Sequence, residues 1–197
     1  MYAKMMSDTA RRIRVRHRVQ SRAAAAAVIC ALALLLTACT GTPRGIEPVE
    51  DFDGERYMGR WYEIKRLDHR FERGLRNVTA VYSLRDDGRV NVTNRGLDAD
   101  SCEWQEVSGT ARFRGDPDTA SLAVTFTWPF AGGYHVFALD EDYQWALVSG
   151  PTRGFLWLLA RDPDMPAAQR ERLVELARVR DFPVDDLILV DHGEPDC

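Results

Sequence analysis

Apolar and polar side chains alternate along most of the middle of this chain. Every second residue from Leu122 to Trp128 is a larger apolar one, and the residues between them are Ala or Thr. The runs from Val107 to Phe113 and from Tyr134 to Ala138 also have a period of two. This period indicates strands with one buried face. We expect eight strands, over residues 59–66, 78–85, 89–95, 103–113, 120–128, 134–140, 143–149 and 154–161.

Short turns separate the expected strands. Asp86-Asp87-Gly88 has the composition of a hairpin turn, and Asp116-Pro117 and Gly150-Pro151 mark further reversals. Short connections make consecutive strands antiparallel neighbours. The chain is therefore expected to be all-β, with eight strands in an up-and-down barrel. A closed barrel of this size has no exposed edge and can hold one small ligand.

The region after the last expected strand has a different period. Between Pro166 and Arg180, apolar residues recur at helical spacing with charged residues between them. The pattern predicts a helix packed on the outside of the barrel, with Asp164 as its N-cap and Pro166 in its first turn. A short final strand is expected over 187–190.

The N-terminal region does not have the pattern of a folded domain. Seven basic residues precede an apolar run from Ala23 to Leu36, which is too short to span a bilayer as a helix. A basic segment, a short apolar segment and small residues indicate a signal peptide over residues 1–38. A buried N-terminal helix is the structural alternative. Translation could begin at Met1, Met5 or Met6.

The end of this segment resembles a bacterial lipobox. Leu36-Thr37-Ala38 precede Cys39, whose thiol would receive diacylglycerol. Ordinary secretory cleavage with a free thiol is the alternative. Residues 39–51, rich in Gly and Pro, are expected to form a lipidated linker, and residues 52–197 the domain. Removing residues 1–38 leaves a net charge of about −10, which disfavours binding to nucleic acid.

The cysteines and the catalytic motifs limit the chemistry. Cys102 and Cys197 remain in an oxidising compartment, and we expect them to form one disulfide. Two distant cysteines lack the spacing of a structural zinc site. The sequence contains no His-Glu-x-x-His, no Gly-x-Ser-x-Gly and no phosphate-binding Gly-rich loop. We therefore expect a protein without catalytic residues, metal or cofactor.

Several blocks together carry a family resemblance. They are Gly59-Arg60-Trp61-Tyr62-Glu63, Leu67 to Leu75, Tyr82 to Gly88, Gly132-Gly133-Tyr134 and Leu156 to Arg161. With these blocks the chain resembles the lipocalins, and within them the bacterial outer-membrane lipoproteins and the apolipoprotein D type. The resemblance covers about Phe52 to Cys197.

The resemblance implies a barrel that binds long-chain fatty acids or lysophospholipids, for lipid storage or transport in envelope maintenance. Cys39 would anchor it in the outer membrane, facing the periplasm, and a homodimer is possible. Gly59, Trp61 and Arg161 would be structural, with Arg161 stacked across Trp61 at the closed end. Arg70 and Arg73 could contact an anionic head group; the alternative is a solvated charged loop, or one locked by its own salt bridges. Ligand contacts are expected from aromatic, aliphatic and polar side chains facing inward: Tyr82, Asn94, Tyr134, Val136 and Trp157.

Two other functions stay open at this point. One is a lipidated interaction module whose barrel is filled by its own side chains. The other is an enzyme that modifies a lipid, which would need an acid, base or nucleophile facing the cavity.

Overall fold

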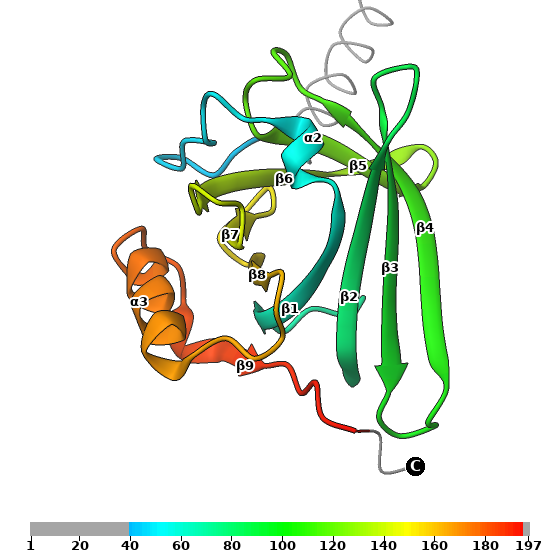
Figure 1. The fold of residues 1–197 in the computed structure, drawn as a ribbon, viewed down its shortest axis with the longest axis vertical. Coiled ribbons are helices and arrows are strands. Elements are labelled where there is room, and N and C mark those ends of the chain that lie inside the picture. Colours follow the sequence, from blue (N-terminus) through cyan, green and yellow to red (C-terminus); the bar gives the residue numbers. More distant parts are fainter. Residues whose placement is uncertain (1–39, 195–197) are drawn as a thin grey trace, which may run out of the picture. The chain divides into compact units, whose positions relative to one another are not determined.

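Eight antiparallel strands form a closed barrel in the computed structural model, which describes residues 40–194 (Figure 1). This confirms the expected architecture. The predicted signal peptide, Cys39 and Cys197 lie outside the described residues. The strands of the barrel are β1 (Gly59–Leu67), β2 (Leu75–Leu84), β3 (Val90–Asp98), β4 (Trp104–Phe113), β5 (Ser121–Thr127), β6 (Phe130–Leu139), β7 (Trp145–Ser149) and β8 (Leu156–Ala160).

Strand β1 closes the barrel because it pairs on both sides. Its first half pairs with β2, with Trp61 opposite Ala80, and it also pairs with β8, with Glu63 opposite Leu159. The register of the β1–β8 pair shifts between Glu63 and Lys65. Past this shift, the second half of β1 pairs with a ninth strand, β9 (Leu187–Leu189), which lies outside the eight.

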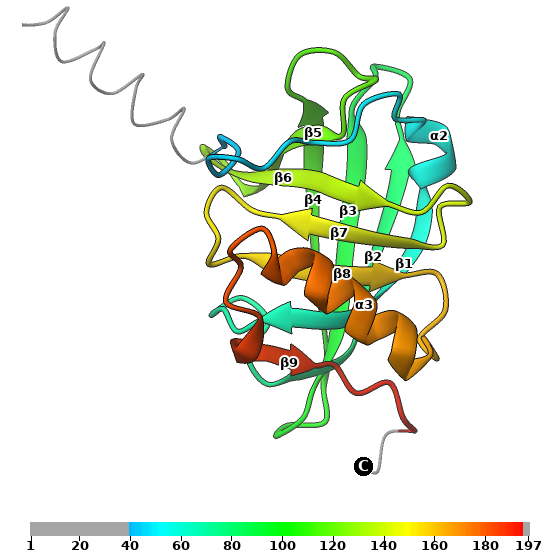
Figure 2. The same cartoon turned by 90° about the vertical axis from the view of Figure 1, so that its left-hand side faces the viewer.

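Two clusters of buried side chains lie on the two faces of the barrel wall. The inner cluster includes Trp61, Tyr82 and Val136. The outer cluster lies between the β6–β8 wall and helix α3 (Ala167–Arg178), which contributes Leu173 and Ala177. Figure 2 shows α3 lying across the outside of β7 and β8. The apolar face of the helix therefore packs against the outside of the barrel, as its period predicted.

The predicted start of α3 is wrong. Pro166 occupies the N-cap position with extended backbone, and no side chain caps the helix. The backbone N–H of Asp164 instead bonds to Asp162 Oδ1. Proline fits here because a residue at the helix boundary needs no intrahelical N–H donor.

The structure also contains a short helix that the sequence pattern did not predict, α2 (Gly54–Tyr57). Asp53 caps it by accepting hydrogen bonds from the N–H groups of Glu55 and Arg56. Its last residue, Tyr57, is buried in the inner cluster. A helix of one turn thus covers the end of the barrel where β1 begins.

The chain before α2 lies against the barrel. Ile46 is buried in the outer cluster, and the Val49 N–H donates to the carbonyl of Val136. Closer to the N-terminus, His135 Nε2 lies 3.0 Å from the Gly41 carbonyl oxygen. The predicted linker therefore follows the wall of the barrel. Between residues 40 and 194, no helix has the length and apolar character needed to cross a membrane.

Candidate functional site

The closed end of the barrel is built around Trp61, which is completely buried. The Arg161 guanidinium lies over its ring, 3.9 Å from the centroid. Arg161 also donates hydrogen bonds of 2.8 Å to the carbonyl oxygens of Arg56, Met58 and Arg60. Gly59 has a φ of 94°, and a Cβ there would lie 3.3 Å from Arg161 Nη1. One guanidinium thus ties α2, β1 and β8 together.

Three tyrosines continue inward from this end. Tyr57 stacks on Tyr82, and the Tyr134 hydroxyl lies 2.7 Å from that of Tyr57 and 3.1 Å from that of Tyr82. Burial is the main cause that raises the pKa of all three phenols above the ordinary value. Near neutral pH they are hydrogen-bonding hydroxyls and poor proton acceptors.

The five predicted ligand contacts differ in how completely their side chains are buried. Tyr82 and Val136 are buried in the inner cluster, whereas Tyr134 and Trp157 are half-buried against it. Asn94 pairs in register with Ala80, another residue of this cluster, so its side chain faces inward. The Asn94 Oδ1 atom is buried and has no hydrogen-bond partner among the described residues. The first two belong to the packed core of the barrel, and the other three face inward and are less completely buried.

Trp157 connects the interior to the loop after β1. Its indole Nε1 donates to Glu72 Oε2 over 3.1 Å, and the ring of His69 meets it edge to face at 5.2 Å. His69 and Glu72 are both buried. The loop over 68–74 therefore folds its own polar residues into the mouth of the barrel.

A cluster of four buried ionisable side chains forms there: Glu63, Arg66, His69 and Glu72. Arg66 Nη1 lies 3.5 Å from Glu63 Oε2, and His69 Nε2 lies 3.0 Å from Glu72 Oε2. Arg66 Nη2 donates to the carbonyls of Glu72 and Leu75. Its Nε and Nη1 atoms make no hydrogen bond to any described residue.

The two glutamates of this cluster titrate in opposite directions. Burial, and then the charge of Glu72, raise the pKa of the Glu63 carboxyl well above its ordinary value, and Arg66 offsets this only in part. Burial also raises the pKa of Glu72, but interactions with His69, Trp157 and Glu63 outweigh it and hold this pKa below the ordinary value. Glu72 is therefore the stronger acid of the two, and the carboxylate charge beside Arg66 lies preferentially on Glu72.

Sequence reasoning missed this cluster as a site. A signal existed at Glu63, which follows Trp61 by two residues and so shares its inward face. No such signal existed for Arg66, because the irregularity between Glu63 and Lys65 breaks the period of two. His69 and Glu72 lie in the same loop as Arg70 and Arg73, for which the sequence pattern predicts only a charged surface.

The other predicted residues lie at the rim or outside the description. Arg73 pairs with Asp68 at 2.8 Å, and both side chains are exposed. The Arg70 guanidinium lies 4.9 Å from the centroid of the Phe71 ring. Cys102 lies in the turn before β4. Cys39 and Cys197 are not among the described residues, so the anchor and the disulfide stay predictions.

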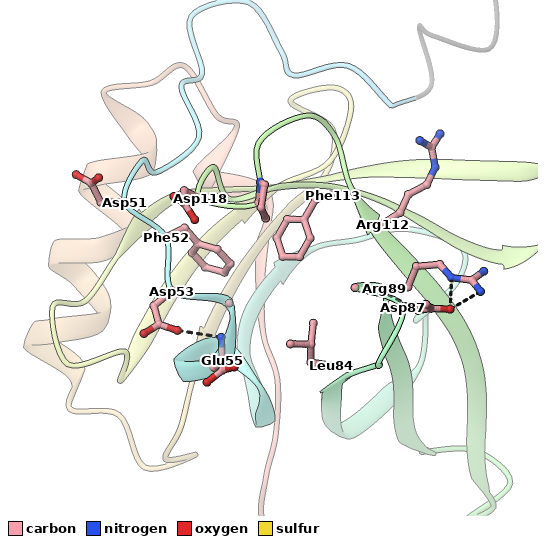
Figure 3. A pocket seen from close by; sticks show the side chains of 13 residues that line it. Asp51, Phe52, Asp53, Glu55, Leu84, Asp87, Arg89, Arg112, Phe113 and Asp118 are labelled. Carbon is pink, nitrogen blue, oxygen red and sulfur yellow. Dashed lines mark hydrogen bonds and ion pairs between the residues drawn. The ribbon is translucent and has the colours of Figure 1, made fainter.

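A pocket of about 830 Å³ lies at the other end of the barrel, between α2, the β2–β3 turn and the β4–β5 turn (Figure 3). Its walls include Phe52, Leu84 and Phe113, with acidic and basic side chains around them. None of the predicted ligand contacts lines it. Trp61 and Tyr57 fill the barrel end beneath α2 and are not among the residues that line this pocket. Within residues 40–194, no three His, Cys, Asp or Glu side chains converge to hold a metal ion.

Comparison with known proteins places this geometry in a family. Residues 52–192 match the lipocalin-like domain. Outer membrane lipoprotein Blc from Citrobacter freundii is 50% identical over 160 residues, which cover 80% of this chain and 90% of that protein. Its counterpart from Vibrio cholerae is 43% identical, covering 83% and 95%. Apolipoprotein D from Bos taurus is 32% identical, covering 73% and 78%.

Solved structures give the same fold at low sequence identity. Insecticyanin from Manduca sexta superposes with a TM-score of 0.64 at 18% identity, over 80% of this chain and 90% of that one. The cockroach allergen Per a 4 superposes with a TM-score of 0.60 at 16% identity, over 76% and 94%. These two similarities concern the barrel alone.

Proposed function

We propose, because this chain belongs to the lipocalin family, that its barrel takes up a lipid with a single acyl chain, namely a long-chain fatty acid or a lysophospholipid. The chain is an outer-membrane lipoprotein like its Blc relatives, held by a lipid anchor. The proposed role is storage or transport of such lipids in envelope maintenance. The observation that carries the proposal is a set of half-buried aromatic side chains that face inward, with buried N–H groups of Arg66 that make no hydrogen bond at the open end.

The acyl chain would lie between Trp157, Tyr134 and Asn94. The two aromatic rings are half-buried and offer apolar surface, and the Asn94 Oδ1 atom lacks a partner. Ligand pockets combine such apolar walls with a few polar groups that fix orientation. Tyr82 and Val136 would support the wall from behind.

The head group would be held by Arg66. Its Nε and Nη1 atoms are buried without a hydrogen bond, and arginine matches both carboxylate and phosphate oxygens. Burial and the charge of Glu72 favour the uncharged form of the neighbouring Glu63, which reduces its repulsion of an anion. Arg70 and Arg73 would then contact lipid only at the rim.

Displacement of a fluorescent fatty acid tests this proposal. The purified protein is expected to bind the probe stoichiometrically and to release it when oleate or lysophosphatidylcholine is added. Trp157→Arg is expected to abolish uptake with the circular dichroism spectrum unchanged. The matched control is Trp104→Arg, since Trp104 is exposed on β4 and packs against Arg95. Saturating lipid that leaves the probe in place would refute the proposal.

One observation favours a second function, the interaction module with a filled barrel. Two of the five predicted ligand contacts, Tyr82 and Val136, are already buried in the core. In that case neither fatty acid nor lysophospholipid would bind, and Trp157→Arg would only destabilise the fold.

For a lipid-modifying enzyme, the buried phenols are the nearest candidates for catalytic residues. Turnover of a lipid that survives Tyr82→Phe and Tyr134→Phe would leave that idea without residues.

The proposal also includes two covalent features, a disulfide between Cys102 and Cys197 and a lipid on Cys39. Glu194 lies beside β2, because Arg76 Nη2 donates to its carbonyl and Asn77 Nδ2 donates to the carbonyl of Gly193. Only two residues separate Glu194 from Cys197, which supports a bridge to Cys102. Mass spectrometry of peptides from the unreduced protein checks this bridge and the lipid on Cys39 together. A Cys102→Ser variant should lose the bridged peptide and keep the lipid.

A further inference from the structure

Three aromatic side chains project into solvent at the open end of the barrel. Trp128 is 86% exposed, Phe130 74% and Phe71 67%. Trp128 and Phe130 form the tip between β5 and β6, and Phe71 lies in the loop after β1. Antiparallel order puts both connections at the end opposite α2. In Figure 2 both lie on the left side of the barrel.

These side chains are not part of either hydrophobic cluster. Exposed apolar groups that gather on one face mark an interaction surface. Trp and Phe at such a tip suit the boundary between lipid head groups and acyl chains. The fold itself therefore gives no reason for their exposure.

The tip carries no charge. From Ser121 to Tyr134 the sequence contains no Asp, Glu, Lys or Arg, although 28% of the whole chain is charged. Inserting an ionised side chain into a bilayer carries a large free-energy penalty. A neutral hairpin with aromatic residues at its turn avoids that penalty.

The described chain begins beside the same tip. A Cβ placed on Gly133 would lie 3.0 Å from the Thr40 carbonyl oxygen, and Gly133 follows Phe130 by three residues. The Gly41 carbonyl is held by His135 two residues further along β6. Thr40 directly follows Cys39, so an anchor on Cys39 would be one residue away from this part of the chain.

We propose that the β5–β6 tip, with Phe71 beside the mouth, docks onto the phospholipid leaflet that holds the anchor. Trp128 and Phe130 insert at the interface, and the open end of the barrel then faces the membrane. The docking surface does not depend on lipid uptake, since none of its residues lines the interior.

Quenching of tryptophan fluorescence tests the docked orientation. The lipidated full-length product is reconstituted in phosphatidylethanolamine and phosphatidylglycerol vesicles whose acyl chains carry bromine. We expect quenching in the wild type and loss of most of it in Trp128→Phe. Trp104→Phe is the matched control, because Trp104 is 48% exposed and lies under Arg95 on the outer face. It should keep the quenching.

Two results would overturn the proposal. Equal quenching in the wild type and in Trp128→Phe would show that the tip stays out of the bilayer. A Trp128→Cys variant that forms a disulfide-linked dimer in plain vesicles, where Trp104→Cys does not, would show that a second copy covers the tip. Binding of fatty acid by all variants alike would leave the proposed function intact in either case.

Discussion

The two ends of the barrel use their polar and aromatic residues in opposite ways. At the closed end, the Arg161 guanidinium donates to four carbonyls and lies over the Trp61 ring, and the aromatic side chains are buried. At the open end, Arg66 keeps unsatisfied N–H groups inside the barrel, while Trp128 is exposed. Hydrogen bonds from Arg161 hold the closed end rigid, whereas the N–H groups of Arg66 that make no hydrogen bond remain available to a ligand. The closed end therefore serves the stability of the barrel, and the open end serves the proposed binding.

Removing one tryptophan from each end should give the largest difference in the free energy of unfolding between the two ends. Trp61→Ala should lower the free energy of unfolding by about 3–5 kcal/mol, because a large buried side chain leaves a cavity. Trp128→Ala should change it by no more than about 0.5 kcal/mol, as is usual for exposed positions. Urea denaturation followed by circular dichroism measures both. Similar losses would mean that the tip is structural.

The two glutamates at the mouth offer the next largest effect. Glu72→Gln should cost about 3 kcal/mol, because Arg66 then remains as an uncompensated buried charge. Glu63→Gln is the matched control and should cost less at pH 7, since burial and the charge of Glu72 favour the uncharged form of this carboxyl. Equal effects of the two changes in chemical denaturation would contradict the assigned charges.

A smaller effect is expected from Arg161→Lys at the closed end. The ammonium group keeps the charge but cannot reach three carbonyls and cover the Trp61 ring together, so about 1–2 kcal/mol should be lost. Arg70→Lys, at the rim of the open end, should leave thermal stability unchanged. If Arg161→Lys were equally silent, the closed end would not depend on this guanidinium.

A further effect, which is absent near neutral pH, concerns the outer face of β6. Burial lowers the pKa of His135 from 6.5 to about 4, and Arg114 adds to this, while the Gly41 and Thr40 carbonyls oppose it. The unfolded chain therefore binds a proton that the folded chain excludes, and stability falls as pH drops from about 6.5 to about 4. Thermal melts across this range should show a weaker pH dependence in His135→Gln. An identical dependence would exclude His135 as the cause.

The sequence predicted the barrel because alternation is a property of neighbouring residues. The strands around Leu122 and Val136 and the helix containing Leu173 follow directly from their periods. Element ends were less accurate: β6 begins at Phe130 rather than Tyr134, and Trp128 lies beyond β5. Glycine at 132 and 133 has little intrinsic strand preference, so pairing with β5 decides that boundary.

The interior of the site could be predicted only in part. Trp157 and Asn94 face inward by period and resemblance, but the position of Arg66 depends on a local irregularity in β1. The entry of His69 and Glu72 depends on how one loop folds back onto Trp157. These are tertiary contacts between distant residues, and no local pattern encodes them.

The contact between Thr40 and β6 limits how far the barrel could lie from a membrane that holds its N-terminal anchor. One residue of chain spans at most about 3.6 Å, so an anchor on Cys39 leaves almost no tether between the bilayer and the barrel wall. Such a barrel cannot cross the periplasm on its own. Under the proposed function it would exchange lipid with the leaflet that holds the anchor, and delivery to the opposite membrane would need a second carrier.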